Sequence, residues 1–425
     1  MANPRSLPPA FVNREGHLHC EEVSLKTIAE EVGTPVYVYS AALLRGAARE
    51  MTGALDGLVD PVIAYAVKAN TNPAVLKLLA DEGLGADIVS IGEYRHARTA
   101  GMAIDKLLFS GVGKTRPEME EALAGGLLQF NVESMEELRE LSAVAEAVGK
   151  QAPVGLRINP DVAAGTHAKI TTGTADTKFG IPAAQALEAF RLGRSLPGID
   201  LKSITIHIGS QLTSLDPLER AFARLGEIIA TLRDDGIHLS IADLGGGLGV
   251  DYGPDQPEPP SIAEYGAMVK RATRDWDLRL VFEPGRSIAG EAGVLLSRVV
   301  RIKPGEHAPW LIVDAAMNDL MRPTLYDAYH HIEAVRPGGE TTRYNVVGPV
   351  CESGDTFARR RSMDHVAPGD LIVFRTVGAY GAAMSNGYNS RALAPEVLVD
   401  GNRWAVVRKR IDLAEASRVD LPDWL

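Results

Sequence analysis

The sequence contains only two cysteines, Cys20 and Cys351, among 425 residues. Two thiols cannot build a disulfide framework, and neither lies in a CxxC or Cys/His spacing, so we expect no metal site. The chain also lacks any apolar run of about 18 residues, the length that would indicate a membrane span. Residues 1–12 hold prolines and no apolar stretch of the kind found in secretory signals. The expected location is therefore a reducing cytoplasm.

The chain also has fewer basic than acidic residues. The chain has 44 Lys and Arg against 55 Asp and Glu, which leaves a formal net charge of −11. The phosphates of nucleic acids and anionic membranes would repel such a protein, so neither is an expected partner. With 45% hydrophobic residues, the composition is that of an ordinary soluble protein, long enough for roughly two or three domains.

Short apolar, β-branched runs alternate with stretches rich in Ala, Leu, Glu and Arg. Fully apolar strands that alternate with helices are typical of a parallel sheet covered on both faces. Eight such units indicate a (β/α)8 barrel. An open doubly wound sheet is the alternative, but it would use fewer strands and place a Gly-rich loop after its first strand. The eight expected strands are residues 62–69, 85–90, 107–111, 127–132, 154–159, 203–209, 241–245 and 278–284.

The pattern changes after Gly285, where strand-like runs follow one another with little helix between them. This predicts a mostly antiparallel β domain, to which the early run 36–39 could also contribute. We therefore expect a barrel at residues 40–288 and a β domain formed by residues 1–39 and 289–425. The expected strands of the β domain are residues 294–302, 310–315, 344–350, 370–377, 396–399 and 404–409.

Four polar features fall at the ends of the expected barrel strands: Lys68, His207, the triple glycine 245–247, and Glu283. Because catalytic groups of such barrels gather at the carboxyl ends of the strands, all four are expected at one mouth. Each has an ordinary explanation taken alone. Lys68 could be a rim ion pair, His207 a buried core histidine, the glycines a tight turn, and Glu283 the partner of a cation.

The four features also match one cofactor. A desolvated lysine amine can form a Schiff base, and glycine backbone can approach a phosphate closely. A carboxylate can keep a pyridine nitrogen protonated, and an imidazole can stack on a flat ring. Together they indicate pyridoxal 5'-phosphate, with Lys68 as the attachment point.

Longer motifs carry a family resemblance. The chain resembles the fold-type III pyridoxal-phosphate decarboxylases over nearly its whole length, and within them the branch that acts on meso-2,6-diaminopimelate. The similar segments are residues 64–70, 85–93, 207–211, 245–249, 283–286, 317–326, 348–355 and 378–381.

The resemblance implies roles for individual residues. Lys68 would carry the cofactor and Cys351 would be the acid that protonates the product. The implied cofactor-binding residues are Lys68, His207, Ser210, Gly245, Gly246, Gly247, Glu283, Gly285, Arg286 and Tyr380. The implied substrate-binding residues are Arg286, Arg322, Tyr326, Glu352 and Tyr380. The β domain would complete the active site within an obligate homodimer, in which the Cys351 loop of one subunit serves the other.

The activity implied is decarboxylation of meso-2,6-diaminopimelate to L-lysine and carbon dioxide, the last step of lysine biosynthesis. Arginines suit the substrate's second carboxylate, because a guanidinium binds a carboxylate through two parallel hydrogen bonds. A related decarboxylase of ornithine, arginine or a carboxylated polyamine is the nearest alternative, and the pair Arg286 and Arg322 argues against it. An alanine-racemase-like isomerase and a non-catalytic cofactor-binding relative are further alternatives. The racemase pattern continues the lysine motif differently from Thr71-Asn72-Pro73.

Overall fold

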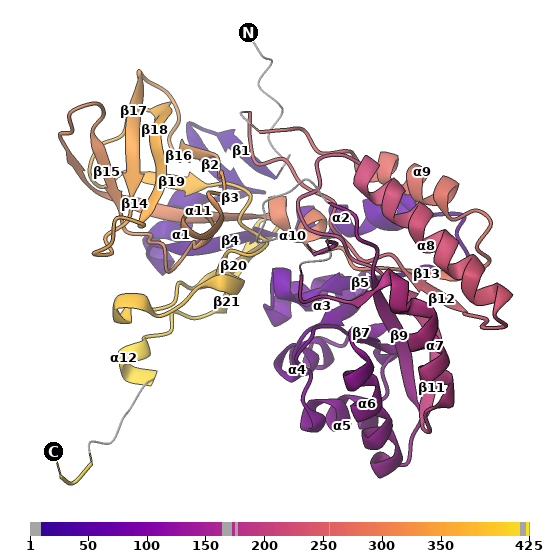
Figure 1. The fold of residues 1–425 in the computed structure, drawn as a ribbon. Helices are drawn as coiled ribbons and strands as arrows, with labels where there is room; N and C mark the ends of the chain where they lie inside the picture. The colour runs from indigo at the N-terminus through magenta and orange to yellow at the C-terminus, as the bar shows by residue number, and fades with distance from the viewer. Residues whose placement is uncertain (1–9, 164–171, 175–176, 255, 417–421, 425) are drawn as a thin grey trace. The chain divides into compact units, whose positions relative to one another are not determined.

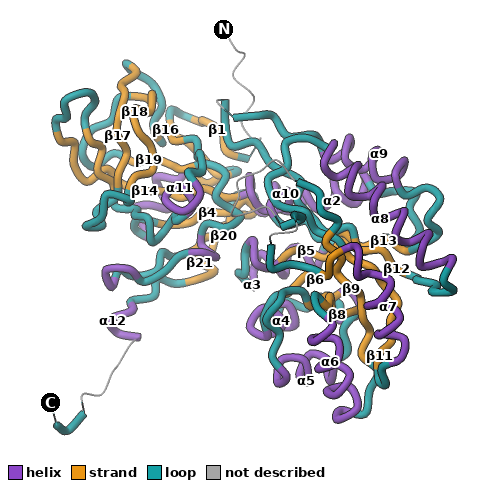
Figure 2. Tube along the Cα trace, viewed as in Figure 1, coloured by secondary structure: helices purple, strands orange, loops and turns teal. Residues whose placement is uncertain are grey.

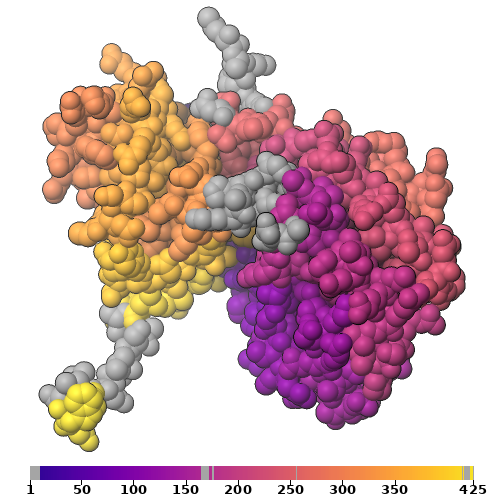
Figure 3. Space-filling model, viewed as in Figure 1, coloured from indigo at the N-terminus to yellow at the C-terminus, as the bar shows by residue number. Residues whose placement is uncertain are grey.

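The computed structural model describes residues 10–424 except 164–171, 175–176, 255 and 417–421. The chain divides into two compact units (Figure 1). Unit 1 comprises Met1–Leu43, Asp251–Gln256 and Ala289–Leu425, and unit 2 comprises Leu44–Val250 and Pro257–Ile288. In the space-filling view, unit 2 is largely purple to magenta, and the C-terminal part of unit 1 is orange to yellow (Figure 3).

Unit 2 is a closed barrel of eight parallel strands. The strands run in the order β9-β11-β12-β13-β5-β6-β7-β8, and a further pairing between β8 and β9 closes the circle. The predicted (β/α)8 barrel is confirmed, and the short strand β10 (Ile181–Pro182) adds to β9 outside the circle. The strands are β5 (Val62–Ala66), β6 (Gly85–Ile88), β7 (Leu107–Phe109), β8 (Gln129–Val132), β9 (Ala152–Asn159), β11 (Ile199–Thr205), β12 (Ile241–Asp243) and β13 (Arg279–Phe282).

Helices follow the strands and surround them (Figure 2). Several begin at a side chain that accepts a hydrogen bond from an otherwise unpaired N–H group of the first turn, as Asn72 and Ser134 do. The helices of unit 2 are α2 (Ala41–Ala54, whose first residues belong to unit 1), α3 (Pro73–Asp81), α4 (Ile91–Thr99), α5 (Arg116–Gly125), α6 (Met135–Val148), α7 (Ala186–Ser195), α8 (Asp216–Asp234) and α9 (Ile262–Ala272).

The barrel changes from apolar to polar along its strands. Val62, Leu108, Ile241 and Val281 belong to one buried apolar cluster. Two residues further along a strand, the side chain lies on the same face, so Asp243 follows Ile241 and Glu283 follows Val281. Asp243 is fully buried. The alternation therefore places carboxyl groups above an apolar layer, toward the carboxyl ends of the strands.

Six of the eight barrel strands end earlier than predicted, and in two of them the difference changes where a site residue lies. The run 62–69 is strand only as far as Ala66, and Val67–Ala69 forms a 3-10 turn, η1. The run 203–209 is strand only as far as Thr205, so His207 lies in a loop and not in a strand. One neighbour of each strand also ends here: β13 ends at Phe282 before the turn at Pro284, and β12 ends at Asp243 before the triple glycine.

Unit 1 is a mostly antiparallel sheet in the order β18-β17-β15-β14-β4-β20-β21, with β19 pairing with β14 and β16 beside it. The predicted antiparallel character is confirmed, although β4 pairs in parallel with β20 and β15 with β17. A separate small sheet holds the first three strands. The strands are β1 (Phe11–Arg14), β2 (His17–Cys20), β3 (Val23–Ser24), β4 (Val36–Ser40), β14 (Gly293–Lys303), β15 (Trp310–Val313), β16 (Ile332–Ala334), β17 (Thr341–Val347), β18 (Thr356–Asp364), β19 (Leu371–Phe374), β20 (Glu396–Asp400) and β21 (Arg403–Arg408).

A continuous apolar core joins these strands to α1 (Leu25–Val32), with Val36, Val38, Val294 and Leu296 among its members. The other helices are short: α10 (Arg286–Ala289), which ends at the first residue of unit 1's last segment, α11 (Arg322–Tyr326) and α12 (Leu413–Ala416). None of the described helices combines the length and apolar character needed to cross a lipid bilayer.

Candidate active site

Lys68 lies at the carboxyl end of the first barrel strand, in turn η1. Its Nζ is 2.7 Å from Oδ2 of Asp87, the third residue of β6, and the two form an ion pair. Asp87 is fully buried, whereas the side chain of Lys68 is 38% exposed. The other oxygen of Asp87, Oδ1, has no hydrogen-bond partner among the described residues. A buried carboxylate thus anchors an amine that still reaches the barrel mouth.

The triple glycine follows β12 and is packed too tightly for any side chain. A Cβ on Gly245 would lie 2.4 Å from the carbonyl oxygen of Ile206, and a Cβ on Gly246 would lie 2.2 Å from that of Glu283. Gly245 and Gly247 also adopt positive φ angles of 64° and 114°, which glycine tolerates best. The N–H of Gly245 donates to Asp243 at 2.9 Å, so the loop is held from within the barrel.

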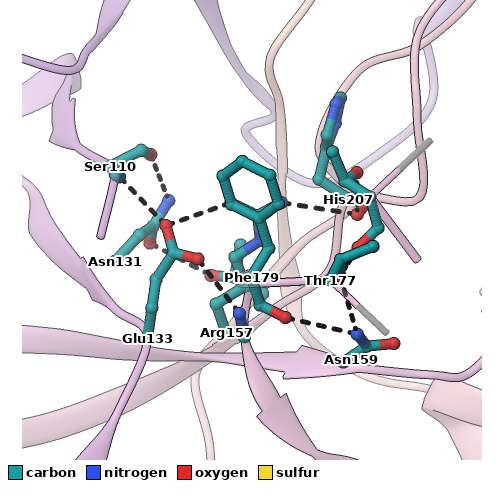
Figure 4. A network of polar contacts seen from close by, with 12 residues as sticks. Ser110, Asn131, Glu133, Arg157, Asn159, Thr177, Phe179 and His207 are labelled. Atoms are coloured by element: carbon teal, nitrogen blue, oxygen red, sulfur yellow. Dashed lines mark hydrogen bonds and ion pairs between the residues drawn. The ribbon is translucent and has the colours of Figure 1, made fainter. Parts of the chain in front are cut away.

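Glu283 and Asp243 belong to a buried polar network at the centre of the barrel mouth. Nδ2 of Asn131, from β8, lies 3.0 Å from both Oε1 of Glu283 and Oδ2 of Asp243. The hydroxyl of Ser110 lies 3.5 Å from Oε1 of Glu283. It also lies 3.1 Å from Nδ2 of Asn131, as Figure 4 shows. On the other side of the amide, Oδ1 of Asn131 accepts from Thr205 at 3.0 Å. Residues in or just after β7, β11, β12 and β13 therefore hold the Asn131 amide in place. The amide in turn orients the carboxyl groups of Glu283 and Asp243.

Burial dominates the protonation of these acids. Loss of solvent raises the pKa of Glu283 well above its usual value, and the carboxylates of Asp243 and Asp87 raise it further. Lys68 and Arg157 oppose that shift. Burial also raises the pKa of Asp243 to about 6. Three buried acids, Asp87, Asp243 and Glu283, would therefore be stabilised by a positively charged group of a ligand. A protonated pyridine nitrogen would be such a group.

His207 follows β11 and contacts the glycine loop. Its Nδ1 accepts a hydrogen bond from the N–H of Gly246 at 3.1 Å. Burial lowers the pKa of His207 well below its usual value, and the charges of Arg157 and Lys68 lower it further. A neutral ring with an accepting Nδ1 carries its proton on Nε2. His207 is half-buried in a loop, not enclosed in the apolar core.

Arg157, from β9, connects His207 to a buried carboxylate (Figure 4). Its Nη1 lies 3.1 Å from Oε1 of Glu133, and its Nη2 donates to the carbonyl of His207 at 3.5 Å. Its guanidinium also covers the ring of Phe179, 4.9 Å from the ring centre. Glu133 further accepts the N–H groups of Gly111 and Gly180, each at 3.1 Å. These contacts give the rim a fixed cation beside His207.

Arg286 completes the barrel residues predicted from the sequence. It begins α10 and is buried, with Nη2 3.0 Å from Oγ of Ser210. A Cβ on the preceding Gly285 would lie 3.0 Å from that of Ala66, so a glycine allows this turn to approach η1. Unit 2 therefore gathers at its carboxyl rim all the predicted barrel residues: Lys68, His207, Ser210, Gly245, Gly246, Gly247, Glu283, Gly285 and Arg286.

The predicted residues of unit 1 lie on two loops and one short helix. Cys351 and Glu352 occupy an exposed position in the loop between β17 and β18, and Tyr380 follows β19 at φ 59°. Arg322 and Tyr326 are the first and last residues of α11. Arg322 is buried, and Tyr326 is partly buried.

Asp355 connects the Cys351 loop to the segment before α11. Its two carboxylate oxygens accept the N–H groups of Met317 and Val350, each at 2.7 Å. The hydroxyl of Thr324, in α11, donates to the carbonyl of Gly354 at 2.7 Å. The thiol loop and the arginine helix are therefore one connected structure.

Several residues of these networks carry no role in the sequence-based prediction, namely Asp87, Asn131, Glu133, Arg157 and Asp243. Asp87 and Asp243 could have been suspected, because each is an acid within an expected apolar strand. Asn131 offers no comparable indication, since its importance depends on which residues the fold brings next to it.

A barrel with a rim lysine, a glycine loop and a buried carboxyl group defines the class of barrel proteins that use pyridoxal phosphate. Comparison with known proteins agrees. Residues 43–290 match the family described as pyridoxal-dependent decarboxylase, pyridoxal binding domain. The chain is 52% identical to the diaminopimelate decarboxylase of Zymomonas mobilis, over 98% of this chain and 99% of that protein. It belongs to the diaminopimelate decarboxylase family, as the sequence resemblance predicted.

Solved structures of that family have the same fold. The Helicobacter pylori diaminopimelate decarboxylase complexed with L-lysine is 39% identical, with a TM-score of 0.88 over 92% of this chain and 97% of that one. The M. jannaschii diaminopimelate decarboxylase is 33% identical, with a TM-score of 0.93 over 98% of this chain and 99% of that one. The cofactor of the family is pyridoxal 5'-phosphate, and the barrel residues described above fit it.

Proposed function

We propose that the chain decarboxylates meso-2,6-diaminopimelate to L-lysine and carbon dioxide with pyridoxal 5'-phosphate as cofactor, the last step of lysine biosynthesis. The observation that carries the proposal is the 52% identity with a diaminopimelate decarboxylase over nearly the full length of both proteins. The barrel supports it independently, because Lys68, the glycine loop and Glu283 occupy one rim.

Lys68 is the residue that holds the cofactor covalently. Asp87 keeps its amine at the mouth of the barrel through the 2.7 Å ion pair. Glu283 would pair with the pyridine nitrogen of the cofactor, and Asn131 fixes the orientation of its carboxyl group. When bound, pyridoxal phosphate accepts the electron pair that departing carbon dioxide leaves behind.

The remaining barrel residues position the cofactor. His207 is neutral and hydrogen-bonded to Gly246, which suits a ring that stacks on a flat aromatic system and not one that carries charge. The glycine loop gives backbone access to the phosphate, because no Cβ stands in the way. The other residues assigned to cofactor binding are Ser210, Gly285, Arg286 and Tyr380.

Cys351 donates the proton that replaces the lost carboxyl group. Its thiol is exposed, as a proton donor to a bound substrate must be, and Asp355 holds its loop through the N–H of Val350. Cys20, by contrast, is buried in the apolar core of unit 1. The two cysteines of the chain thus have different surroundings.

Arginines select the substrate. Arg286 and Arg322 bind carboxylate, Tyr326 and Tyr380 contribute hydroxyl groups, and Glu352 accepts the distal ammonium. Lysine and ornithine lack the second carboxylate, so they would leave a buried guanidinium without its anionic partner, which is costly. Arg322 and Arg286 are both about 95% buried, with 5% and 6% of their surface exposed.

We further propose that the barrel at residues 40–288 binds the cofactor, and that residues 1–39 and 289–425 complete the active site in a homodimer. In that arrangement, the Cys351 loop of one subunit serves the active site of the other. A small amino acid is the substrate, and the cytoplasm is the site of action.

The test offers the purified protein with pyridoxal phosphate four amino acids in turn: meso-diaminopimelate, lysine, ornithine and arginine. Released carbon dioxide and the amine product are measured for each. The proposal expects carbon dioxide and L-lysine from diaminopimelate, and little turnover of the other three. Preferred turnover of ornithine or arginine would favour the related decarboxylases. Cofactor binding without release of carbon dioxide from any of the four would indicate a non-catalytic relative.

A further inference from the structure

The guanidinium of Arg322 is held by two neutral groups of unit 1. Its Nη1 lies 2.8 Å from Nε2 of His330, and its Cζ lies 4.7 Å from the centre of the Tyr252 ring. The rings of Tyr252 and His330 meet edge to face, with centres 5.2 Å apart and an interplanar angle of 90°. Arg322, His330 and Tyr252 are each at most 5% exposed.

The hydrogen bonds determine which nitrogen of His330 carries a proton. Arginine has only donors and remains protonated, so Nη1 of Arg322 donates and Nε2 of His330 accepts. The other ring nitrogen, Nδ1, lies 2.9 Å from the carbonyl oxygen of Arg375, which can only accept. His330 is therefore a neutral ring with its proton on Nδ1, fixed at both nitrogens.

The carbonyl that holds His330 belongs to a rigid segment. Arg375 follows β19, its N–H donates to the carbonyl of His331 at 2.8 Å, and its side chain pairs with Glu333 in β16. The carbonyl of His330 itself accepts from Nη1 of Arg361, in β18, at 2.7 Å. The sheet thus fixes the imidazole of His330, and the imidazole in turn fixes Arg322, the first residue of α11.

We propose that His330 is a positioning residue that fixes the Arg322 guanidinium for a substrate carboxylate, with the Tyr252 ring supporting the guanidinium face. A guanidinium binds a carboxylate through two parallel bonds only when its plane is correctly turned, so orientation contributes to affinity. Neither His330 nor Tyr252 supplies negative charge, so both orient Arg322 without neutralising it. The inference rests on the substrate role of Arg322 in the proposed function.

The experiment compares two replacements of the imidazole. In His330→Asn, the amide can still donate to the Arg375 carbonyl but does not reach Arg322. In His330→Gln, the amide oxygen reaches the place of Nε2 and can accept from Arg322. His365 is the matched control, because it lies in the same unit, is exposed and bonds to Tyr344 at 3.2 Å. Arg322→Ala and the double variant Arg322→Ala/His330→Asn complete the set.

His330→Asn is expected to raise KM for meso-diaminopimelate by about ten-fold with kcat changed less than about three-fold. His330→Gln should recover most of the loss, and His365→Asn should match the wild type. In the Arg322→Ala background, His330→Asn should add less than about two-fold, because the residue acts through Arg322. Thermal unfolding and cofactor absorbance confirm that each variant is folded and loaded.

The possible failures are distinguishable. A wild-type protein that releases no carbon dioxide from diaminopimelate overturns the proposed function, and with it this inference. If the wild type is active but Arg322→Ala leaves KM for diaminopimelate unchanged, Arg322 does not bind the substrate. If Arg322→Ala raises KM for diaminopimelate but His330→Asn leaves it unchanged, only the positioning role of His330 is overturned. Equal damage in His330→Asn and His330→Gln, accompanied by a lower melting temperature, would make His330 a structural residue only.

Discussion

The Nζ of Lys68 lies 2.7 Å from Oδ2 of Asp87, so the amine at the barrel mouth is paired with a fully buried carboxylate. The pair joins two adjacent parallel strands at their carboxyl ends, β5 through turn η1 and β6 directly. Such a pair keeps a lysine extended toward one point, which is what covalent attachment of an aldehyde requires.

Replacing Lys68 by Ala should abolish decarboxylation, with kcat falling by several orders of magnitude. The amine at this position is proposed to hold the cofactor, and no other residue of β5 or η1 carries a side-chain amine. Borohydride reduction followed by peptide mass spectrometry should find the cofactor on Lys68 in the wild type and on no peptide of the variant. Lys77 is a suitable control, since it forms an exposed pair with Asp81 in α3, and Lys77→Ala should retain full activity. Reduction that labels a different lysine would contradict the assignment.

In the cofactor-free protein, Asp243→Asn should gain stability relative to the wild type as the pH rises from about 4 to about 6. Burial raises the pKa of Asp243 from 3.8 to about 6, so the folded wild type binds more protons than the unfolded chain between these values. Its stability relative to the variant is therefore lost as the pH rises from about 4 to about 6, by on the order of 3 kcal/mol. Urea unfolding of both proteins across this pH range measures the difference. A constant difference from pH 4 to pH 8 would show that Asp243 does not titrate in this way.

Cys351→Ala should lower kcat by about a hundred- to ten-thousand-fold, the usual contribution of a positioned proton donor. KM for diaminopimelate and the cofactor absorbance should change little, because the thiol is assigned to proton donation and not to binding. Steady-state kinetics in carbon dioxide release, with the products identified, provide the measurement. Cys20→Ala is the matched control: Cys20 is buried in the core, so that variant should lose stability while kcat is preserved. A Cys351→Ala enzyme with normal kcat would rule out the thiol as the acid.

Gly246→Ala should weaken cofactor binding by at least about ten-fold. Its new Cβ would lie 2.2 Å from the carbonyl oxygen of Glu283, so either the glycine loop or the turn at Pro284 must move. Such overpacking also costs stability, about 1–3 kcal/mol. Cofactor retained after dialysis, measured by absorbance, tests the first effect, and urea unfolding tests the second. Gly113→Ala is the control, because a Cβ there meets nothing within 4 Å. Unaltered affinity and stability in Gly246→Ala would mean that the loop is not constrained as the structure indicates.

The sequence predicts the fold well where local pattern is enough. Alternating apolar strands and helical stretches indicate the barrel, and the same periodicity identifies most strands of unit 1. Among the described strands of unit 1 it misses β1, β2, β3, β16 and β18. The nine residues of β18 include three consecutive arginines, Arg359, Arg360 and Arg361. These arginines look like a solvated segment, yet β18 pairs with β17 over almost its whole length. Pairing with a neighbouring strand overrides composition there.

The residues of the candidate site also differ in how well the sequence predicts them. Lys68, the triple glycine, Glu283 and Arg286 are recognisable because each lies within a short, ordered motif whose chemistry depends on residues next to it in the chain. His207 is recognisable by its motif, but its place in a loop is not, because the apolar run that contains it continues past Thr205, where β11 ends.

The sequence alone determined the class of fold, and it pointed to the lysine and the glycine loop that we propose for the cofactor, because strand periodicity and tight turns are local properties. Only the tertiary structure decided that Asn131 orients Glu283, 152 positions away along the chain, and that a neutral His330 faces Arg322. Barrel closure and sheet pairing bring such residues together, and the resulting burial sets their hydrogen bonds and pKa values. No local pattern encodes those contacts.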